Sequence, residues 1–163
     1  MQEILRMKSN NIERPLVSVI LPTFNHGKFI GKAIESVLSQ TYNNFELIII
    51  DNYSEDNTES VAVFYKDNRI NYLKFRNNGI IAASRNYGIK HSHGNYIAFL
   101  DSDDTWHEQK LEKQLPHFQA PEIIGVASNA TLVAETPYYR KINLAKSKLG
   151  YIDYQYRDIL NRS

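Results

Sequence analysis

Three carboxylate side chains lie within four consecutive positions, at Asp101, Asp103 and Asp104. They directly follow residues 96–100, an uncharged apolar run that predicts a strand buried on both faces of a parallel sheet. In open α/β sheets, ligands bind beyond the carboxyl ends of the strands, which is where these acids fall. Neighbouring carboxylates repel one another unless a cation or a basic group compensates, and a divalent metal ion is the simplest compensation. The alternative is a solvated turn in which Asp104 or Thr105 caps the next helix.

The composition indicates one globular domain. The chain has 163 residues, of which 42% are hydrophobic and 23% charged. A formal net charge of +1, with the charges dispersed, gives no reason to expect nucleic acid as a partner. No apolar run approaches the roughly 18 residues of a membrane span, so we expect a cytoplasmic protein, or one at the inner face of the membrane. The absence of cysteine excludes disulfides and thiolate metal sites.

Apolar runs alternate with segments of helical spacing along the chain, which predicts an α/β fold. Residues 1–15 form a polar lead-in, and residues 16–163 form a single domain that we expect to be incomplete at its C-terminus. The alternation predicts a three-layer α/β/α sandwich around a mainly parallel sheet. Asn25 is the predicted N-cap of the first helix. The expected strands are 16–21, 45–50, 70–75, 96–100 and 123–132, and the expected helices are 28–40, one that ends near 68, 80–93 and 107–115.

Three of the predicted strands end in polar loops, at residues 22–25, 51–56 and 101–104. On a parallel sheet these loops emerge at the same edge, which predicts one composite site. The chain has neither a dinucleotide-binding fingerprint nor a P-loop, so bound phosphates would need help from a metal ion or from side chains.

Five motifs in this order resemble the N-terminal half of a family-2 inverting glycosyltransferase of the GT-A fold. The resemblance covers residues 16–115 and then weakens. It implies transfer of a sugar from a nucleotide-diphosphate donor, usually a UDP sugar, to a saccharide or lipid-linked acceptor in cell-surface polysaccharide biosynthesis. The motifs are VSVILPTFN (17–25), IESVLSQTY (34–42), ELIIID (46–51), SRNYGI (84–89) and YIAFLDSDDTW (96–106).

The resemblance also implies roles for individual residues. Asp103 would be the metal-coordinating aspartate of the Asp-x-Asp motif, with Asp104 nearby and Mn²⁺ or Mg²⁺ as the ion. Asp101 would contact the ribose or sugar of the donor. A divalent ion held by one or two carboxylates would stabilise the negative charge that develops on the departing diphosphate. The residues expected to bind the donor are Pro22, Thr23, Asn25, Asp51, Arg85, Asp101 and Ser102.

The chain departs from the family pattern after the second strand. Asp51 matches the residue that reads the base, although an aspartate here could instead cap a helix. Asn52 and Tyr53 stand where family members commonly have aspartate and glycine, which leaves the nucleotide preference open. Tyr53 could stack on a base or only fill space. Arg85 could pair with the diphosphate or with the acidic cluster, or lie on the surface.

An inverting transfer needs a general base for the acceptor hydroxyl, and none is recognised. The carboxylates beyond residue 132 are Glu135, Asp153 and Asp158. We therefore expect the chain to carry the donor-binding half and to lack the catalytic base and most of the acceptor site. Apolar surface left uncovered in this way predicts self-association. The alternatives are a non-catalytic nucleotide-sugar-binding fragment or a nucleotidyltransferase, although residues 22–27 make a poor triphosphate loop.

Overall fold

The computed structural model describes residues 14–119 and 123–128. The chain divides into two compact units, Met1–Lys113 and Gln114–Ser163. The second unit has a 3-10 helix at Leu115–Gln119, and residues 123–128 form neither helix nor strand. The remaining elements are β1 (Val17–Thr23), α2 (Ile30–Leu38), β2 (Phe45–Asp51), α3 (Thr58–Phe64), β3 (Ile70–Lys74), α4 (Ile81–Lys90), β4 (Tyr96–Phe99) and α5 (Lys110–Gln114).

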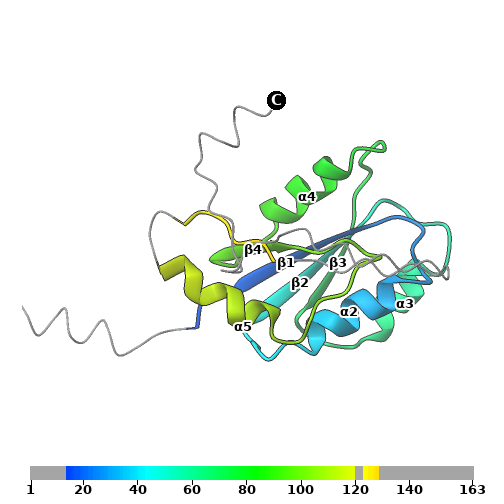
Figure 1. Ribbon diagram of the computed structural model, residues 1–163. Helices are drawn as coiled ribbons and strands as arrows, with labels where there is room; N and C mark the ends of the chain where they lie inside the picture. The colour runs from blue at the N-terminus through cyan, green and yellow to red at the C-terminus, as the bar shows by residue number, and fades with distance from the viewer. Residues whose placement is uncertain (1–13, 120–122, 129–163) are drawn as a thin grey trace, which may run out of the picture. The chain divides into compact units, whose positions relative to one another are not determined.

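The strands form one sheet in the order β3-β2-β1-β4, and all the strand pairs of the described residues are parallel. α4 covers one face of this sheet, and α2 and α3 lie on the other (Figure 1). Parallel neighbours need a crossover connection, which explains the helix after each of the first three strands. The predicted three-layer sandwich with a parallel sheet is confirmed.

β1 and β2 are the central strands, and almost every residue in them is buried. A glycine lets α4 pack closely over them, because a Cβ atom at Gly88 would lie only 2.6 Å from Cγ2 of Ile20. Burial on both faces explains why these two strands are continuous apolar runs in the sequence. The core cluster on this side consists of Ile20, Ile48 and Ile50, with Leu73, Phe75 and Tyr87 packed against it.

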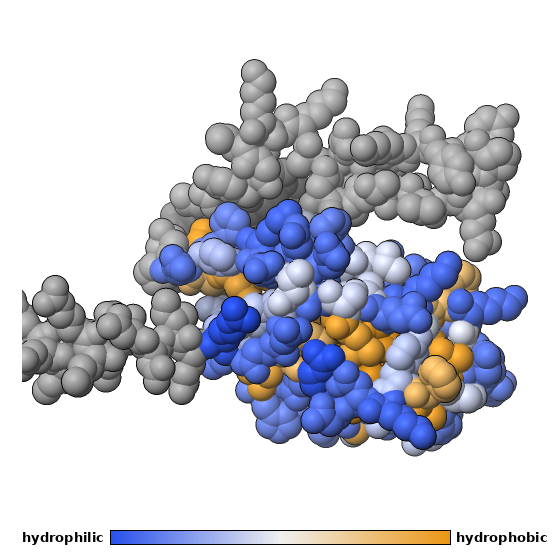
Figure 2. Space-filling view, turned by 90° about the horizontal axis from the view of Figure 1, so that it is seen from below, coloured by the Kyte–Doolittle hydropathy of each residue, from blue (hydrophilic) through white to orange (hydrophobic). Residues whose placement is uncertain are grey.

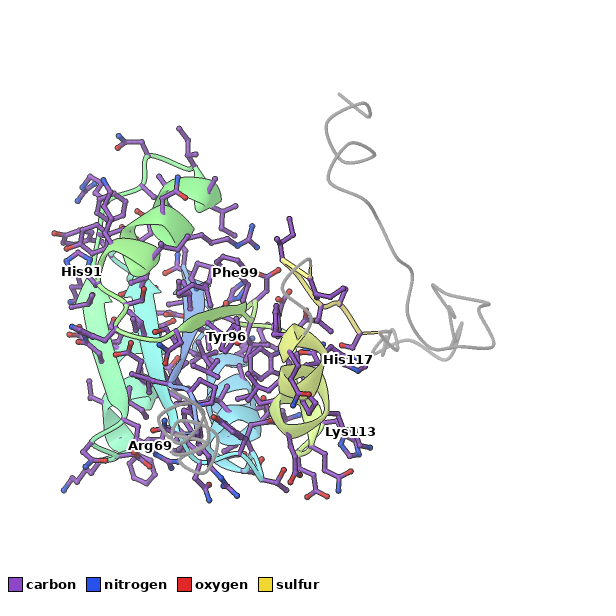
Figure 3. The ribbon with its side chains drawn as sticks, turned by 90° about the vertical axis from the view of Figure 1, so that its left-hand side faces the viewer. Arg69, His91, Tyr96, Phe99, Lys113 and His117 are labelled. Atoms are coloured by element: carbon purple, nitrogen blue, oxygen red, sulfur yellow. The ribbon has the colours of Figure 1, made fainter. Side chains whose placement is uncertain are left out.

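β4 is an edge strand, and the prediction that it is buried on both faces was wrong. Among the described strands it pairs only with β1. Its residues alternate between half-buried Tyr96 and Ala98 and exposed Ile97 and Phe99, with Phe99 48% exposed (Figure 3). The apolar run therefore reflects one packed face and one uncovered face of this strand.

Several helix boundaries also differ from the prediction. Asn25 does not cap α2, since the N-cap residue is Phe29 and it makes no side-chain capping bond. Instead, the carbonyl oxygen of His26 accepts hydrogen bonds from the N–H groups of Phe29 and Ile30, each at 2.9 Å. α3 ends at Phe64 rather than near residue 68. The strand predicted at 123–132 is absent from 123–128, and the rest of it lies outside the described residues.

The surface seen in Figure 2 is mainly hydrophilic, with hydrophobic patches among the polar side chains. Two exposed apolar residues lie at the end of α3, where Val63 is 56% and Phe64 is 78% exposed. None of the helices in the described part of the chain is long and apolar enough to cross a membrane. Self-association through exposed apolar surface stays a prediction.

Candidate functional site

Three loops meet at the carboxyl ends of the strands. Thr23 and Asp51 are register partners at the ends of β1 and β2. The N–H of Leu100 donates to the carbonyl oxygen of Ile20 at 3.1 Å, which places the segment after β4 beside β1. The loops thus leave the same edge of the sheet, as expected for parallel strands. They are the β1 loop (residues 24–29), the β2 loop (residues 52–57) and the acidic loop (residues 101–104).

Hydrogen bonds hold the β1 and β2 loops together. The N–H of Asn25 donates to Oγ of Ser54, and Oδ1 of Asn25 accepts from the N–H of Glu55, both at 2.8 Å. The N–H of Gly27 donates to Oδ2 of Asp56 at 2.9 Å. Asn25 adopts a φ of 52°, a left-handed conformation that asparagine tolerates better than most residues. Asn25 therefore joins two loops rather than capping a helix.

Asp51 is completely buried, and both of its carboxylate oxygens have partners. Ser54 donates to Oδ1 through its N–H at 3.1 Å and through its hydroxyl at 2.5 Å, and Tyr72 donates to Oδ2 at 2.5 Å. Burial, and then the hydrogen bond to Asp51, raise the pKa of Tyr72 above its usual value. Asp51 does not cap α3, whose N-cap is Asn57. Its contact with a base stays a prediction.

Pro22 and Thr23 end β1 and are buried. The β1–β4 pairing stops at Ile20, so Pro22 has a neighbouring strand on one side only, which suits a residue without an N–H. The Thr23 hydroxyl is buried and has no hydrogen-bond partner in the described residues, which makes it a candidate ligand contact. Phe24 follows and is 50% exposed. Sequence reasoning missed Phe24, although an aromatic residue directly after a strand at this edge was a usable signal.

The acidic loop combines one paired carboxylate with two exposed ones. Nη2 of Arg85 lies 2.7 Å from Oδ1 of Asp101, so Arg85 pairs with the acidic cluster, one of the three roles considered for it. Asp103 and Asp104 are exposed. Burial, and then the charges of Asp103 and Asp101, raise the pKa of Asp104. The predicted mutual repulsion is thus present, and it favours a cation at this loop.

Ser102 lies between these acids but is only 3% exposed. Its hydroxyl is 2.6 Å from Nδ1 of His26, a residue that sequence reasoning did not single out. Tyr53, by contrast, is 46% exposed and has a φ of 58°. The guanidinium carbon of Arg76 lies 4.8 Å from the centre of its ring. A direct contact of Ser102 or Tyr53 with the donor stays a prediction.

The exposed carboxylates of Asp103 and Asp104 fit a divalent ion. Mg²⁺ and similar hard ions prefer oxygen ligands and are commonly held by one or two carboxylates, water and substrate phosphates. The described residues contain no group of three or more His, Cys, Asp or Glu that could hold an ion by themselves. Among the described residues, Asp103 and Asp104 would therefore supply only part of the coordination shell of such an ion.

The model of the family described as glycosyl transferase family 2 matches residues 18–161. TuaG of Bacillus subtilis, provisionally assigned as a teichuronic acid biosynthesis glycosyltransferase, is 42% identical over 144 residues, which cover 86% of this chain and 57% of TuaG. WfgD of Escherichia coli, a UDP-Glc:α-D-GlcNAc-diphosphoundecaprenol β-1,3-glucosyltransferase, is 44% identical over 136 residues, covering 83% of this chain and 53% of WfgD. S. aureus TarS in complex with UDP has a similar fold, with a TM-score of 0.59 and 28% identity over 65% of this chain and 32% of that chain.

The fold is that of GT-A glycosyltransferases. The chain belongs to glycosyl transferase family 2, as the sequence resemblance indicated. This membership argues against the nucleotidyltransferase interpretation. The chain spans little more than half the length of TuaG and WfgD.

Proposed function

We propose that this chain carries the donor-binding half of an inverting glycosyltransferase that uses a nucleotide-diphosphate sugar, most simply a UDP sugar. The observation that carries the proposal is the acidic loop, in which exposed Asp103 and Asp104 follow the Arg85–Asp101 pair. It lies at the sheet edge beside the β1 loop. UDP bound to TarS and the UDP-Glc donor in the name of WfgD support this choice of nucleotide.

Each group has a distinct role in this proposal. Asp103 and Asp104 would hold Mn²⁺ or Mg²⁺, and the ion would supply positive charge to stabilise the departing diphosphate. Asp101, oriented by Arg85, accepts hydrogen bonds from donor hydroxyl groups. The exposed ring of Phe24 offers a face on which the base can stack. A general base must still remove the acceptor proton, and the carboxylates considered for that step lie outside the described residues.

The acceptor is the least constrained part of the proposal. WfgD acts, by its name, on a sugar carried by diphosphoundecaprenol, a lipid-linked substrate. A saccharide or lipid-linked acceptor, met at the inner face of a membrane, is therefore the acceptor class we propose here. We place the proposed self-association at exposed apolar side chains such as Ile97 and Phe99 of β4.

Calorimetric titration of UDP with and without Mn²⁺ tests the proposal. We expect metal-dependent binding of UDP to the unsubstituted chain. In Asp103→Asn the affinity for UDP should fall about tenfold or more, because losing a metal ligand should cost at least as much as losing a residue that only hydrogen-bonds to a ligand. Glu35→Gln removes the same charge at an exposed position of α2 and serves as the control. If UDP, GDP and dTDP all fail to bind, the proposal is wrong. Binding without donor hydrolysis or transfer would identify a non-catalytic binding module.

A further inference from the structure

His26 connects the β1 loop to the acidic loop. Its Nδ1 atom lies 2.6 Å from Oγ of Ser102, a hydrogen-bond distance between residues 76 positions apart in the chain. The two loops come from the neighbouring strands β1 and β4. Ser102 is 3% exposed and His26 is half-buried, so the bond is partly shielded from solvent.

The main chain and the ring of His26 are themselves held in place. Its N–H donates to the buried hydroxyl oxygen of Thr58 at 3.0 Å. Its carbonyl oxygen accepts from the N–H groups of Phe29 and of Ile30, the first residue of α2. Its ring meets the ring of Phe29 edge to face, with centroids 5.8 Å apart. His26 is therefore a fixed support, because contacts on three sides determine where its Nδ1 atom lies.

The acidic loop needs such support because its charges oppose its compact form. The N–H of Asp104 donates to the carbonyl oxygen of Asp101 at 3.0 Å, which closes a tight turn. This turn brings Asp104 within electrostatic reach of Asp101 and Asp103, whose negative charges oppose its ionisation. Arg85 fixes the turn at Asp101, and His26 fixes it at the next residue. The exposed Asp103 thus directly follows two residues, Asp101 and Ser102, whose side chains are held by hydrogen bonds.

We propose that His26 is a positioning residue for the donor site: through Ser102 it holds the acidic loop in the conformation that binds the divalent ion and the diphosphate. This inference rests on the proposed function, because it assumes that the acidic loop is the site of metal-dependent nucleotide binding. Its physical basis is preorganisation, since a loop ordered before binding loses less conformational freedom when the ligand arrives.

A double-mutant cycle on UDP binding in the presence of Mn²⁺ tests the coupling. His26→Phe keeps an aromatic ring against Phe29 but removes the hydrogen bond, and Ser102→Ala removes the partner hydroxyl. We expect each single variant to weaken binding about fivefold, the effect of one lost hydrogen bond. The double variant should be no weaker than the worse single variant, because neither group is then left unsatisfied. His26→Asn, whose amide can reach the place of Nδ1, should restore most of the affinity.

Amide hydrogen exchange in the ligand-free chain supplies a readout that does not depend on nucleotide. Exchange in residues 101–104 should be faster in His26→Phe than in the unsubstituted chain and in His26→Asn. Unchanged exchange together with unchanged UDP affinity in His26→Phe would overturn this inference and leave the proposed function intact. Failure of the unsubstituted chain to bind UDP would instead refute the proposed function, and this inference with it.

Discussion

Removing the Tyr72 hydroxyl tests whether the buried Asp51 carboxylate depends on its partners in the sheet. Asp51 has no exposed surface, and Tyr72 supplies the 2.5 Å hydrogen bond to Oδ2. A hydrogen bond to a charged group contributes about 1.5–3 kcal/mol, so we expect Tyr72→Phe to lower the free energy of unfolding by about 2 kcal/mol. In urea this corresponds to a midpoint lower by about 1 M with an unchanged slope.

The pH dependence of this difference provides a second check. The pKa of Tyr72 is raised in the folded chain above its ordinary value of 10.0. Above that pH the unfolded chain loses the phenolic proton while the folded chain keeps it, so the contribution of Tyr72 to stability falls as the pH rises. The difference between the two proteins should therefore narrow above pH 10.0, by about 1.4 kcal/mol per pH unit until the folded pKa is reached.

Tyr65→Phe is the matched control for the same chemical change. Its hydroxyl donates to Oε1 of Glu35 at 2.9 Å in an exposed setting, so its loss should cost less than about 1 kcal/mol. A loss below about 0.5 kcal/mol in Tyr72→Phe, or a difference that stays constant to high pH, would refute the reasoning. The first result would mean that Asp51 is held mainly by Ser54, and the second that the pKa of Tyr72 is not raised in the folded chain.

Two further predictions follow from particular residues. Asp67→Asn should lower stability at pH 7 by about 1 kcal/mol, because the Arg69 guanidinium holds the pKa of this half-buried carboxyl at about 2. Because folding lowers this pKa from 3.8, the difference in urea midpoint between the unsubstituted chain and Asp67→Asn should be largest above pH 3.8. It should disappear as the pH falls toward 2, where the carboxyl is protonated in the folded chain too. Tyr53→Gly should relieve about 1 kcal/mol of left-handed backbone strain. If the Tyr53 ring stacks on the base, UDP affinity in calorimetry should fall about fivefold or more, whereas unchanged affinity would show that the ring only fills space.

The central strands β1 and β2 were predictable because a strand that is buried on both faces is a continuous apolar run in the sequence. β1 and β2 are buried on both faces, so nearly every residue is apolar and the runs end where the polar loops begin. β4 has a similar run, but the burial of each of its faces depends on whether other segments cover that face, which periodicity does not reveal. The helix ends were overestimated because the residues that follow α2, α3 and α4 are mostly polar, so no apolar spacing marks where these helices stop.

The residues of the candidate site were predictable by type and place, but their partners were not. Asp51 and Asp103 both follow apolar strands, yet one is fully buried and the other exposed. Tyr72 reaches Asp51 because β3 lies next to β2 in a specific register, which no local pattern encodes. The bond between His26 and Ser102 depends in the same way on contacts between distant segments.

Four acidic residues at this edge differ in whether their oxygens already accept hydrogen bonds, and this difference indicates where a metal ion can bind. The carboxylate oxygens of Asp51 and Asp56 accept hydrogen bonds from N–H and hydroxyl groups of the chain itself. These bonds fix the β1 and β2 loops before any ligand binds. Asp103 and Asp104 keep exposed oxygens. Because hard cations require oxygens that the chain does not already use, an ion at this edge should bind at Asp103 and Asp104 and not at Asp51 or Asp56. Substitutions at Asp51 should therefore act mainly on stability, and those at Asp103 mainly on metal-dependent binding.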